Sequence, residues 1–220
     1  AQNTYLKLLP PEISAPFSAE LKSIDPGMTC LNLYLGFKED PRKFNFQGEN
    51  YWLFNTYDQK EMIKSISAAP ENEVQFAFLS FGSLNDPKAN SFTGQAIVAG
   101  SSLDFQKWSQ SEKKNRPEDY NEFKNSLIPK ILKFLDEKFP GFSNNVEFAD
   151  LATPLTFEHY SNHPHGQIYG IPFTPKRMNN EWLKAQTPVK NLFLTGADVG
   201  SPGITGAVSG GFVAAKEILG

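Results

Sequence analysis

The sequence has little of what marks several common classes of protein. A single cysteine, Cys30, among 220 residues excludes an intrachain disulfide, and its apolar neighbours favour a plain buried thiol. No apolar run reaches the roughly 18 residues that a transmembrane helix needs. No basic segment precedes an apolar stretch, so no signal peptide is visible, although the chain starts at Ala1 rather than Met. A net charge of −3 gives no electrostatic reason to expect a nucleic-acid partner.

The chain also lacks Gly-x-Gly-x-x-Gly, the motif with which dinucleotide-binding domains seat a pyrophosphate on a helix N-terminus. The nearest strings, Gly200-Ser-Pro-Gly203 and Gly203-Ile-Thr-Gly206, lack the first spacing. No acidic residue follows about 20 positions later, where the ribose contact is expected, because the sequence stops at Gly220. We therefore expect no complete dinucleotide site in this chain.

Histidine is scarce, and its three copies, His159, His163 and His165, lie within seven residues. This spacing could supply three nitrogens to Zn²⁺. However, Pro164 interrupts regular strand pairing, and no further Cys or carboxylate motif converges on the segment, so we expect no metal site. A polar loop near an active site fits better. Because histidine titrates near neutrality, one of the three is a candidate proton donor or substrate-orienting residue.

Phenylalanine, in contrast, is abundant, with 19 copies against three tryptophans and seven tyrosines. Most of these rings are expected to fill the core. Phenylalanine also lines apolar tunnels well, because it fills space without a polar group to satisfy. The candidates for such a lining are Phe44, Phe46, Tyr51, Trp52, Phe54, Phe76, Phe78 and Phe81.

The order of the predicted elements favours the α+β class. Alternating β-forming residues predict strands over residues 28–37, 51–56, 73–82 and 95–101, and a long extended segment over 146–160. Helices are predicted within residues 5–24, over 59–69 up to Pro70, and over 117–139, where Pro129 predicts a kink or a break. Together these elements indicate a domain with a largely antiparallel β-sheet and flanking helices.

The last thirty residues carry a different pattern. Leu192–Leu194 predicts a buried strand, which leads through a glycine-spaced turn into an apolar helix from about Thr205. A turn of this kind brings the backbone N–H groups of a helix N-terminus against a polar ligand. Its glycines remove Cβ atoms that would keep a flat ring from the backbone: Gly196, Gly200, Gly203, Gly206, Gly210 and Gly211. An ordinary strand–loop–helix of a sheet protein is the alternative.

This stretch resembles the C-terminal flavin-contacting segment of the phytoene desaturase-like FAD-dependent oxidoreductases, in the branch of retinol saturases and carotenoid isomerases. A second segment supports the resemblance. Thr153-Pro154-x-Thr156 is similar to the Thr-Pro-x-Thr element of that family, and Gly166-x-x-Tyr169-Gly170 to its Gly-x-x-Tyr-Gly element. The resemblance implies the C-terminal portion of a larger flavoenzyme. Residues 1–165 would be its substrate-binding domain, and residues 166–220 would be the last piece of a Rossmann-like FAD-binding domain.

The resemblance also implies roles for single residues. The cofactor-binding residues would be Gly196, Asp198, Gly203, Thr205, Gly206, Ala207, Tyr169 and Gly170. The substrate contacts would include Phe54, Phe78, Thr156 and Tyr160, and the three histidines are weak candidates for catalysis. FAD would carry the redox chemistry, and a helix N-terminus would stabilise the charge of its reduced form by roughly 0.3–2 kcal/mol.

The implied function is FAD-dependent saturation, desaturation or cis–trans isomerisation of a carotenoid- or retinoid-like polyene. This piece alone is expected to be inactive and to bind FAD weakly or not at all. Its partners would be the lipophilic polyene and the missing N-terminal portion of the same protein. The protein itself would be located in the cytoplasm or attached peripherally to a membrane. A non-catalytic module that binds a lipophilic ligand is the alternative. A flavin amine oxidase would need an aromatic cage, and the pattern from Thr153 to Gly170 argues against it.

Overall fold

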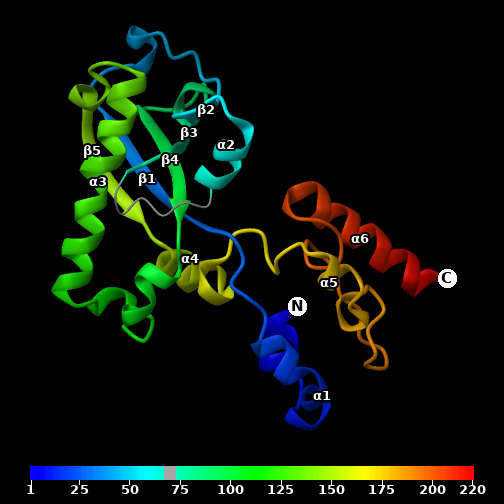
Figure 1. Ribbon diagram of the computed structural model, residues 1–220. Helices are drawn as coiled ribbons and strands as arrows, with labels where there is room; N and C mark the ends of the chain where they lie inside the picture. Colours follow the sequence, from blue (N-terminus) through cyan, green and yellow to red (C-terminus); the bar gives the residue numbers. More distant parts are fainter. Residues whose placement is uncertain (67–72) are drawn as a thin grey trace. The chain divides into compact units, whose positions relative to one another are not determined.

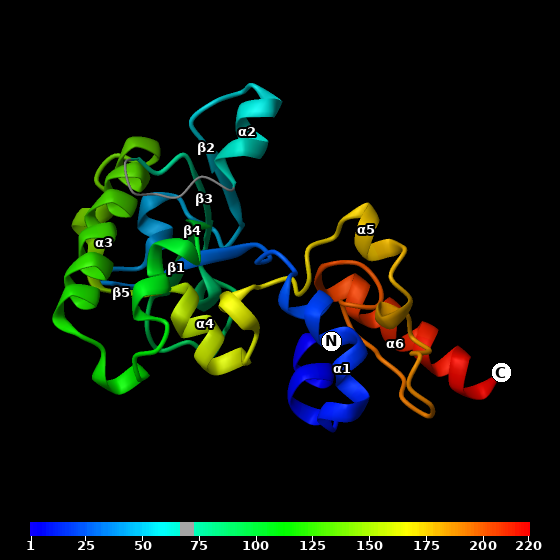
Figure 2. The same ribbon diagram turned by 60° about the horizontal axis from the view of Figure 1, so that its bottom comes forward.

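The computed structural model describes residues 1–66 and 73–220, except for the side chain of Lys114. These residues form two compact units: a sheet unit, Thr29–Asn162, and a terminal unit that joins Ala1–Met28 to His163–Gly220. The two ends of the chain therefore belong to the same unit, drawn in blue and in yellow to red in Figures 1 and 2. The functional division into residues 1–165 and 166–220 stays a prediction, because packing alone does not say what each unit binds.

The sheet unit is built on five antiparallel strands in the order β2-β3-β4-β1-β5. Their bounds are β1 Thr29–Phe37, β2 Tyr51–Phe54, β3 Phe76–Ser80, β4 Thr93–Gly100 and β5 Val146–Ala152. The first four follow the alternating runs, and the antiparallel sheet with its helices confirms the α+β class. Because β1 lies between β4 and β5, its Leu31, Leu33 and Leu35 point to one central, buried face.

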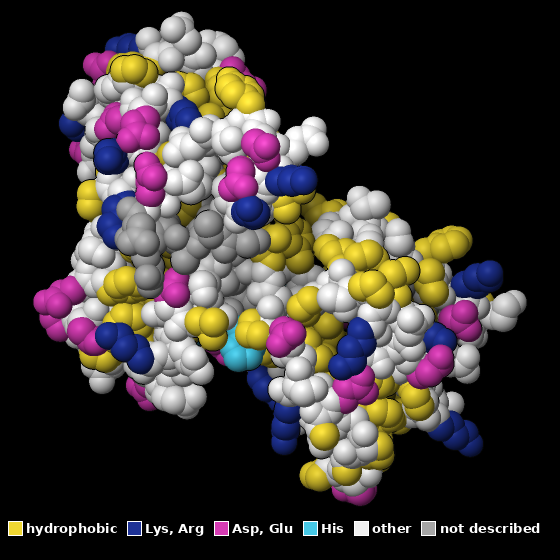
Figure 3. Space-filling model, in the orientation of Figure 1, with side chains coloured by type: hydrophobic (Ala, Val, Ile, Leu, Met, Phe, Trp, Pro, Cys, Tyr) yellow, Lys and Arg dark blue, Asp and Glu magenta, His cyan; other side chains and the backbone are white. Residues whose placement is uncertain are grey.

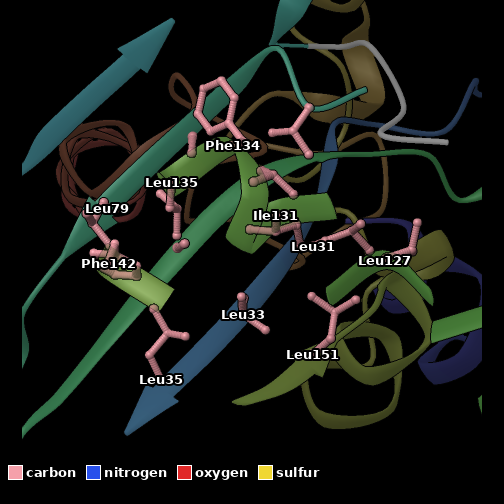
Figure 4. Packing of buried hydrophobic residues seen from close by; sticks show 14 of the residues in the cluster. Leu31, Leu33, Leu35, Leu79, Leu127, Ile131, Phe134, Leu135, Phe142 and Leu151 are labelled. Carbon is pink, nitrogen blue, oxygen red and sulfur yellow. The ribbon is translucent and has the colours of Figure 1, made fainter. Parts of the chain in front are cut away.

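Helix α3, Glu118–Lys138, packs on that face and completes the core. Its Leu127, Ile131 and Leu135 recur at helical spacing and lie against the leucines of the sheet in Figure 4. Pro129 lies inside this helix, which is continuous, so the predicted break into two helices is wrong. Pro129 is exposed, so water can bond the carbonyl that proline leaves free, while buried residues on either side of Pro129 hold the helix on the sheet.

The extended segment predicted over residues 146–160 is wrong in its second half. Strand β5 ends at Ala152, and Pro154–Ser161 forms helix α4. Thr153 is the N-cap residue, and its N–H donates to Thr156 Oγ1 at 3.2 Å. Pro154 takes the first helical position, where its fixed φ suits a helix. The Thr-Pro-x-Thr element is therefore a helix start.

The remaining helices lie around these elements and in the terminal unit. They are α1 Pro11–Lys22, α2 Gln59–Ser65, α5 Pro175–Met178 and α6 Gly203–Leu219, with a π-helical turn at Thr4–Leu8. Short 3₁₀ turns span Pro41–Phe44, Gly82–Leu84, Leu103–Trp108, Lys113–Asn115, Phe142–Asn145, Pro164–Gly166 and Glu181–Leu183. Helix α2 begins where predicted, and its predicted end at Pro70 lies outside the described residues. None of the helices in residues 1–66 and 73–220 combines the length with the hydrophobicity that a membrane span requires.

The core of the terminal unit joins residues from both ends of the chain. The hydroxyl of Tyr5 donates to the carbonyl oxygen of Trp182 at 2.7 Å, and Leu21, Ile171, Leu183 and Leu194 complete the buried cluster. This arrangement makes Ala1–Met28 an integral part of the unit that ends in α6.

The strand predicted at Leu192–Leu194 is wrong. In the described chain this run makes a single β-bridge, between Gln186 and Phe193. Asn191 adopts a φ of 63°, and Thr187 Oγ1 donates to the carbonyl oxygen of Leu192 at 2.8 Å, so a tight turn takes up the run. Leu194 is nevertheless buried, because an apolar side chain can pack without joining a ladder of backbone hydrogen bonds.

Candidate functional site

The glycine-rich loop, residues 195–202, precedes α6 and is held by a buried arginine. Arg177 is 6% exposed, and its guanidinium donates to the carbonyl oxygens of Ile171 and Ala197, each at 2.5 Å. Burial lowers the pKa of Arg177, and the charge of Asp198 partly opposes this shift. Because a guanidinium stays charged in proteins, Arg177 clamps the loop to the segment that follows Gly170. No motif in the sequence pointed to this residue.

Asp198, a predicted cofactor residue, makes its hydrogen bonds within the terminal unit. Its Oδ1 accepts from the N–H of Ile171 at 2.9 Å, and its Oδ2 lies 2.5 Å from the amino group of Ala1. Burial raises the pKa of Asp198, but the Ala1 ammonium, the Ile171 N–H and the charge of Arg177 outweigh burial and hold this pKa below its usual value. Asp198 is therefore a charged anchor of the loop.

Three of the six glycines serve the packing of the loop on α6. A Cβ atom added to Gly206 would lie 1.5 Å from the carbonyl oxygen of Ser201, and one added to Gly210 would lie 2.3 Å from that of Gly196. A Cβ atom at Gly200 would meet the carbonyl oxygen of Gly206 at 2.4 Å. These glycines let the backbone of the loop contact the backbone of α6. This role differs from the predicted one, in which the glycines allow a flat ring to approach the backbone. Gly196 itself, at φ 93°, has open space beside it.

The N-terminus of α6 is open. The helix begins at Gly203, two residues before the predicted start at Thr205, and its N-cap residue Pro202 makes no side-chain capping hydrogen bond. The ring of Tyr169 borders this end, with 3.9 Å between its Cε1 atom and a Cβ atom built at Gly203. Uncapped N–H groups and the helix dipole make the site suitable for an anionic or polar ring edge. Three predicted cofactor residues, Tyr169, Gly203 and Thr205, thus lie at one helix end.

The rest of α6 has two faces. Gly206, Gly210 and Ala214 are buried, and the predicted cofactor residue Ala207 is half-buried in the turn that follows the helix start. Along the other side runs an exposed apolar stripe: Ile204, Val208, Phe212 and Leu219. In Figure 3, yellow hydrophobic side chains gather over the part of the molecule that α6 occupies in Figure 1. A continuous apolar stripe on a surface helix indicates a contact surface.

The three histidines are divided between the two units. His159 lies on α4 of the sheet unit, where its ring centroid is 5.0 Å from that of Tyr160. In the terminal unit, His163 Nδ1 lies 3.1 Å from the carbonyl oxygen of Gln167, and His165 adopts a φ of 59°. Among the residues that the structure describes, no group of three or more His, Cys, Asp or Glu could hold a metal ion. A catalytic role for a histidine stays a prediction.

The sheet sorts the predicted tunnel residues by face. Phe46, Tyr51 and Phe81 belong to the core on the α3 side, where the ring centroids of Phe46 and Phe81 lie 4.4 Å apart. Phe81 is fully buried and Phe46 nearly so. These three rings therefore support the sheet and do not line its open face.

The other face of the sheet carries the predicted tunnel residues of β2 and β3 that do not belong to the core. Trp52 pairs with Phe78 and Phe54 pairs with Phe76 across β2 and β3, which places all four rings on one side. The ring centroids of these pairs lie 5.1 Å and 5.0 Å apart. Trp52 is 63% exposed, so the predicted substrate residues Phe54 and Phe78 belong to an aromatic surface that reaches solvent.

A cross-strand row extends from this aromatic surface. Phe78 pairs with Ile97 of β4, and Ile97 pairs with Asn32 of β1, so Trp52, Phe78, Ile97 and Asn32 stand side by side and are called the aromatic row. Asn32 is 6% exposed, and its Nδ2 donates to Gln95 Oε1 at 3.1 Å. Its Oδ1 has no hydrogen-bond partner among the described residues. A buried acceptor left unpaired costs about 1–3 kcal/mol, a cost that a ligand donor would remove.

The four predicted substrate residues do not line one surface. Thr156 and Tyr160 lie on α4 and border a cavity of about 720 Å³ to which Phe54 and Phe78 do not contribute. Phe54 and Phe78 share the face of the aromatic row. The sheet unit therefore presents two distinct candidate binding surfaces.

No protein-family model matches the chain. Curated relatives do match it. All-trans-retinol 13,14-reductase of Danio rerio is 27% identical over 234 residues, with 99% of this chain and 38% of the relative covered. The human protein of the same name is 26% identical over 231 residues, with the same coverage. A Danio rerio protein named inactive all-trans-retinol 13,14-reductase is 27% identical over 234 residues, with 98% and 38% covered. These matches confirm the resemblance to the retinol saturase branch, and the chain spans about 38% of the length of these relatives.

Proposed function

We propose that this homologue of the all-trans-retinol 13,14-reductases is the C-terminal portion of an FAD-dependent oxidoreductase that saturates a double bond in a retinoid-like polyene alcohol. The names of the relatives support a reductase of a retinoid. The observation that carries the choice of substrate is the aromatic row, which ends at the unpaired acceptor Asn32 Oδ1.

The aromatic row matches an extended polyene with a hydroxyl at one end. Neighbouring strands lie about 4.8 Å apart, so three strand spacings separate Trp52 from Asn32 by about 14 Å. Trp52, Phe78 and Ile97 offer apolar contacts along this length. A hydroxyl donates one hydrogen bond and would satisfy Asn32 Oδ1, whereas a hydrocarbon carotenoid would leave it unpaired. The row therefore favours an alcohol over a hydrocarbon substrate.

The proposed place of FAD is the N-terminus of α6. When bound, FAD would supply hydride chemistry at a conjugated double bond. The uncapped N–H groups of α6 would stabilise negative charge on the ring, Tyr169 would border it, and Gly196 would allow a close approach of the backbone. This chain lacks the Gly-x-Gly-x-x-Gly motif for the pyrophosphate, so we propose that it binds FAD weakly by itself and has no turnover.

The proposed partner of this chain is the remainder of the same protein. The relatives are longer than the region they share with it, which is 38% of their length. The exposed stripe of Ile204, Val208, Phe212 and Leu219 on α6 offers the kind of surface on which the rest of an FAD-binding domain would pack. A lipophilic substrate also favours peripheral attachment of the whole enzyme to a membrane.

A non-catalytic module that binds a lipophilic ligand is the second candidate. The relative named inactive is 27% identical to this chain, the same identity as the Danio rerio reductase. Sequence identity at this level therefore does not distinguish the relative named a reductase from the relative named inactive. The aromatic row could hold a polyene without any cofactor, since none of its four residues depends on one.

The visible absorption spectrum of the protein expressed from its complete reading frame, beside the 220-residue chain, tests the proposal. Flavin bands and saturation of all-trans-retinol in the long form alone would support it. Retinol binding without flavin in either form, even after FAD is added, would favour the binding module. If the long form binds neither flavin nor retinol, both candidate functions are contradicted.

A further inference from the structure

A cavity of about 720 Å³ lies at the β5 edge of the sheet unit. It is lined by β1, β5, the beginning of α3, helix α4 and the residues just before α3. Its lining combines cationic and aromatic side chains, chiefly Lys113, Arg116, Lys124, Tyr34, Phe157 and Tyr160. This composition differs from that of the aromatic row, which carries no charge.

The cavity has an excess of positive charge. Three cations, Lys113, Arg116 and Lys124, face one carboxylate, Asp150, which leaves a net charge of +2 in the lining. Lys124 Nζ lies 2.6 Å from Asp150 Oδ1 and is neutralised by it. Lys113 and Arg116 form no ion pair with a carboxylate in the described part of the chain. An uncharged polyene would leave both cations without a counterion.

Arg116 is held in place by the protein before any ligand arrives. Its Nη1 donates to Ser111 Oγ at 3.3 Å, and its Nη2 donates to the carbonyl oxygen of Leu155 at 3.4 Å. Its Cζ lies 4.8 Å from the ring centroid of Tyr120, whose hydroxyl is 2.9 Å from Thr153 Oγ1. A guanidinium has five N–H donors, so these two hydrogen bonds leave donors for an anion. Prior ordering of this kind lowers the entropy cost of binding.

The aromatic side of the cavity offers ring faces. Lys113 Nζ lies 3.5 Å from the ring centroid of Tyr160, which places one cation directly beside an aromatic ring. Tyr34 is partly exposed on β1, and Phe157 on α4 borders the same space. A planar ring could stack on Tyr34 or Phe157 while its anionic group meets Lys113 and Arg116.

We propose that this cavity binds a small planar molecule that carries a phosphate monoester, of the class of nucleoside monophosphates. A phosphate monoester has a charge of about −1.5 to −2 at neutral pH, which matches the excess charge of the lining. Arginine and lysine are the side chains that suit phosphate oxygens, and the aromatic rings suit a purine. This assignment is independent of the proposed oxidoreductase function. It gives Thr156 and Tyr160 to an anionic ligand rather than to the polyene.

Calorimetric titration of the 220-residue chain with AMP, adenosine and inorganic phosphate tests the assignment. AMP is expected to bind at least about tenfold more tightly than either part alone, and its affinity should fall as salt rises. Arg116→Gln and Lys113→Gln should each weaken AMP about tenfold. The control is Lys133→Gln, which removes an exposed charge on α3 that pairs with Glu137 outside the cavity.

Several outcomes would overturn the proposal. The proposal fails if AMP binds no better than adenosine and phosphate do separately, or if Lys133→Gln weakens AMP binding as much as Arg116→Gln does. The proposal also fails if all-trans-retinoic acid binds more tightly than AMP and loses affinity in Arg116→Gln, because that result assigns the cavity to a conjugated carboxylate. Thermal unfolding followed by circular dichroism shows whether each variant is folded. If Arg116→Gln unfolds, Lys113→Gln carries the test, because the contact of the Lys113 side chain with the described residues is the one with the Tyr160 ring, and no hydrogen bond to the cavity wall within residues 1–66 and 73–220 is lost.

Discussion

Gly170 lies directly against the carboxylate of Asp198, so that a Cβ atom added to Gly170 would come within 2.4 Å of Asp198 Oδ1. Gly170 also has a φ of 74°, which L-residues with a side chain rarely adopt. The last glycine of the Gly-x-x-Tyr-Gly element and the aspartate of the glycine-rich loop therefore form one unit. The conformation of the loop before α6 therefore depends on both Gly170 and Asp198.

Substitution of this glycine should loosen the terminal unit. Gly170→Ala is expected to lower the free energy of unfolding by about 2 kcal/mol, from the left-handed backbone and the contact with Asp198 together. Urea denaturation of the 220-residue chain measures the change. Gly82→Ala is the control, because a Cβ atom at Gly82 meets no atom within 4 Å and its φ is not in the left-handed region. Equal losses in both variants would contradict the role of the Asp198 contact.

Two neighbouring glycines on α6 should respond in opposite ways. Gly210→Ala places a Cβ atom 2.3 Å from the carbonyl oxygen of Gly196 and is expected to cost about 2 kcal/mol of stability. Gly211→Ala meets only Thr195 Oγ1, at 3.6 Å, and should raise stability by about 0.5–1 kcal/mol, the usual effect of alanine in a helix. Thermal unfolding of the two variants shows whether each substitution lowers or raises the stability. Stabilisation by both would mean that α6 does not rest on the loop as described.

Asn32 and Asn145 are both buried, but they differ in their partners. Asn32→Leu removes an unpaired acceptor but also breaks the hydrogen bond from Nδ2 to Gln95 Oε1, so the two effects oppose each other and stability should change by less than about 1 kcal/mol. Asn145→Leu breaks two hydrogen bonds, from Glu39 N–H to Oδ1 and from Nδ2 to the Glu39 carbonyl, and should cost about 2–3 kcal/mol. Chemical denaturation measures both variants.

Asn32→Leu also separates recognition of the retinol hydroxyl from binding of the polyene chain. Asn32→Leu should weaken retinol binding by about tenfold while a hydrocarbon polyene binds as before. Retinol fluorescence titration of the full-length protein reports the affinities. A variant that still prefers retinol to the hydrocarbon would exclude Asn32 as the hydroxyl contact, even if the protein proves to be a retinoid reductase.

The two faces of the sheet should behave differently when an aromatic ring is removed. Trp52→Ala should change stability little, because Trp52 is 63% exposed, but it should weaken retinol binding several-fold through the lost ring contact. Phe81→Ala, in the core at 0% exposure, should cost about 3–5 kcal/mol. Fluorescence titration and urea denaturation together separate the two effects. Unchanged retinol affinity in Trp52→Ala would remove this end of the aromatic row from the proposal.

Acid should weaken the terminal unit through Asp198. Its pKa is lower in the folded protein than its ordinary value, so its charge contributes stability that is fully present above the ordinary carboxyl pKa. That contribution is lost as the pH falls from about 4 through the lowered pKa of the folded state. Asp198→Asn should flatten the decline between the two pKa values. Unfolding curves over this acid range, on protein that begins at Ala1, measure it, and parallel curves for both proteins would contradict the assigned role.

Much of the sheet unit could be predicted because its signals are local. Leu31, Leu33 and Leu35 alternate along β1, and Leu127, Ile131 and Leu135 recur at helical spacing along α3. These periods follow from backbone geometry, so they are visible without knowledge of any partner. The start of α4 was also signalled locally, by Thr153, Pro154 and Thr156, but β-forming residues before it suggested that the strand continued.

The most informative features of the candidate site could not be predicted. Nothing around Arg177 in the sequence marks it as buried, since its partners Ile171 and Ala197 come from two different loops. Asn32 reads as one polar position in an apolar strand. Its unpaired Oδ1 becomes visible only once the strands on either side and the burial of the side chain are known.

The alternating and helical runs, the positions of the glycines and the order of the two motifs were readable without coordinates. They were enough to give the α+β class and the resemblance to the retinol saturase branch. The fold was needed to learn that Leu192–Leu194 forms no strand, that Gly206 and Gly210 touch the loop backbone, and that the aromatics divide between two faces. The difference arises because periodicity is a property of the local backbone. Strand pairing, close packing and the partner of a buried polar atom instead depend on residues far away in the chain.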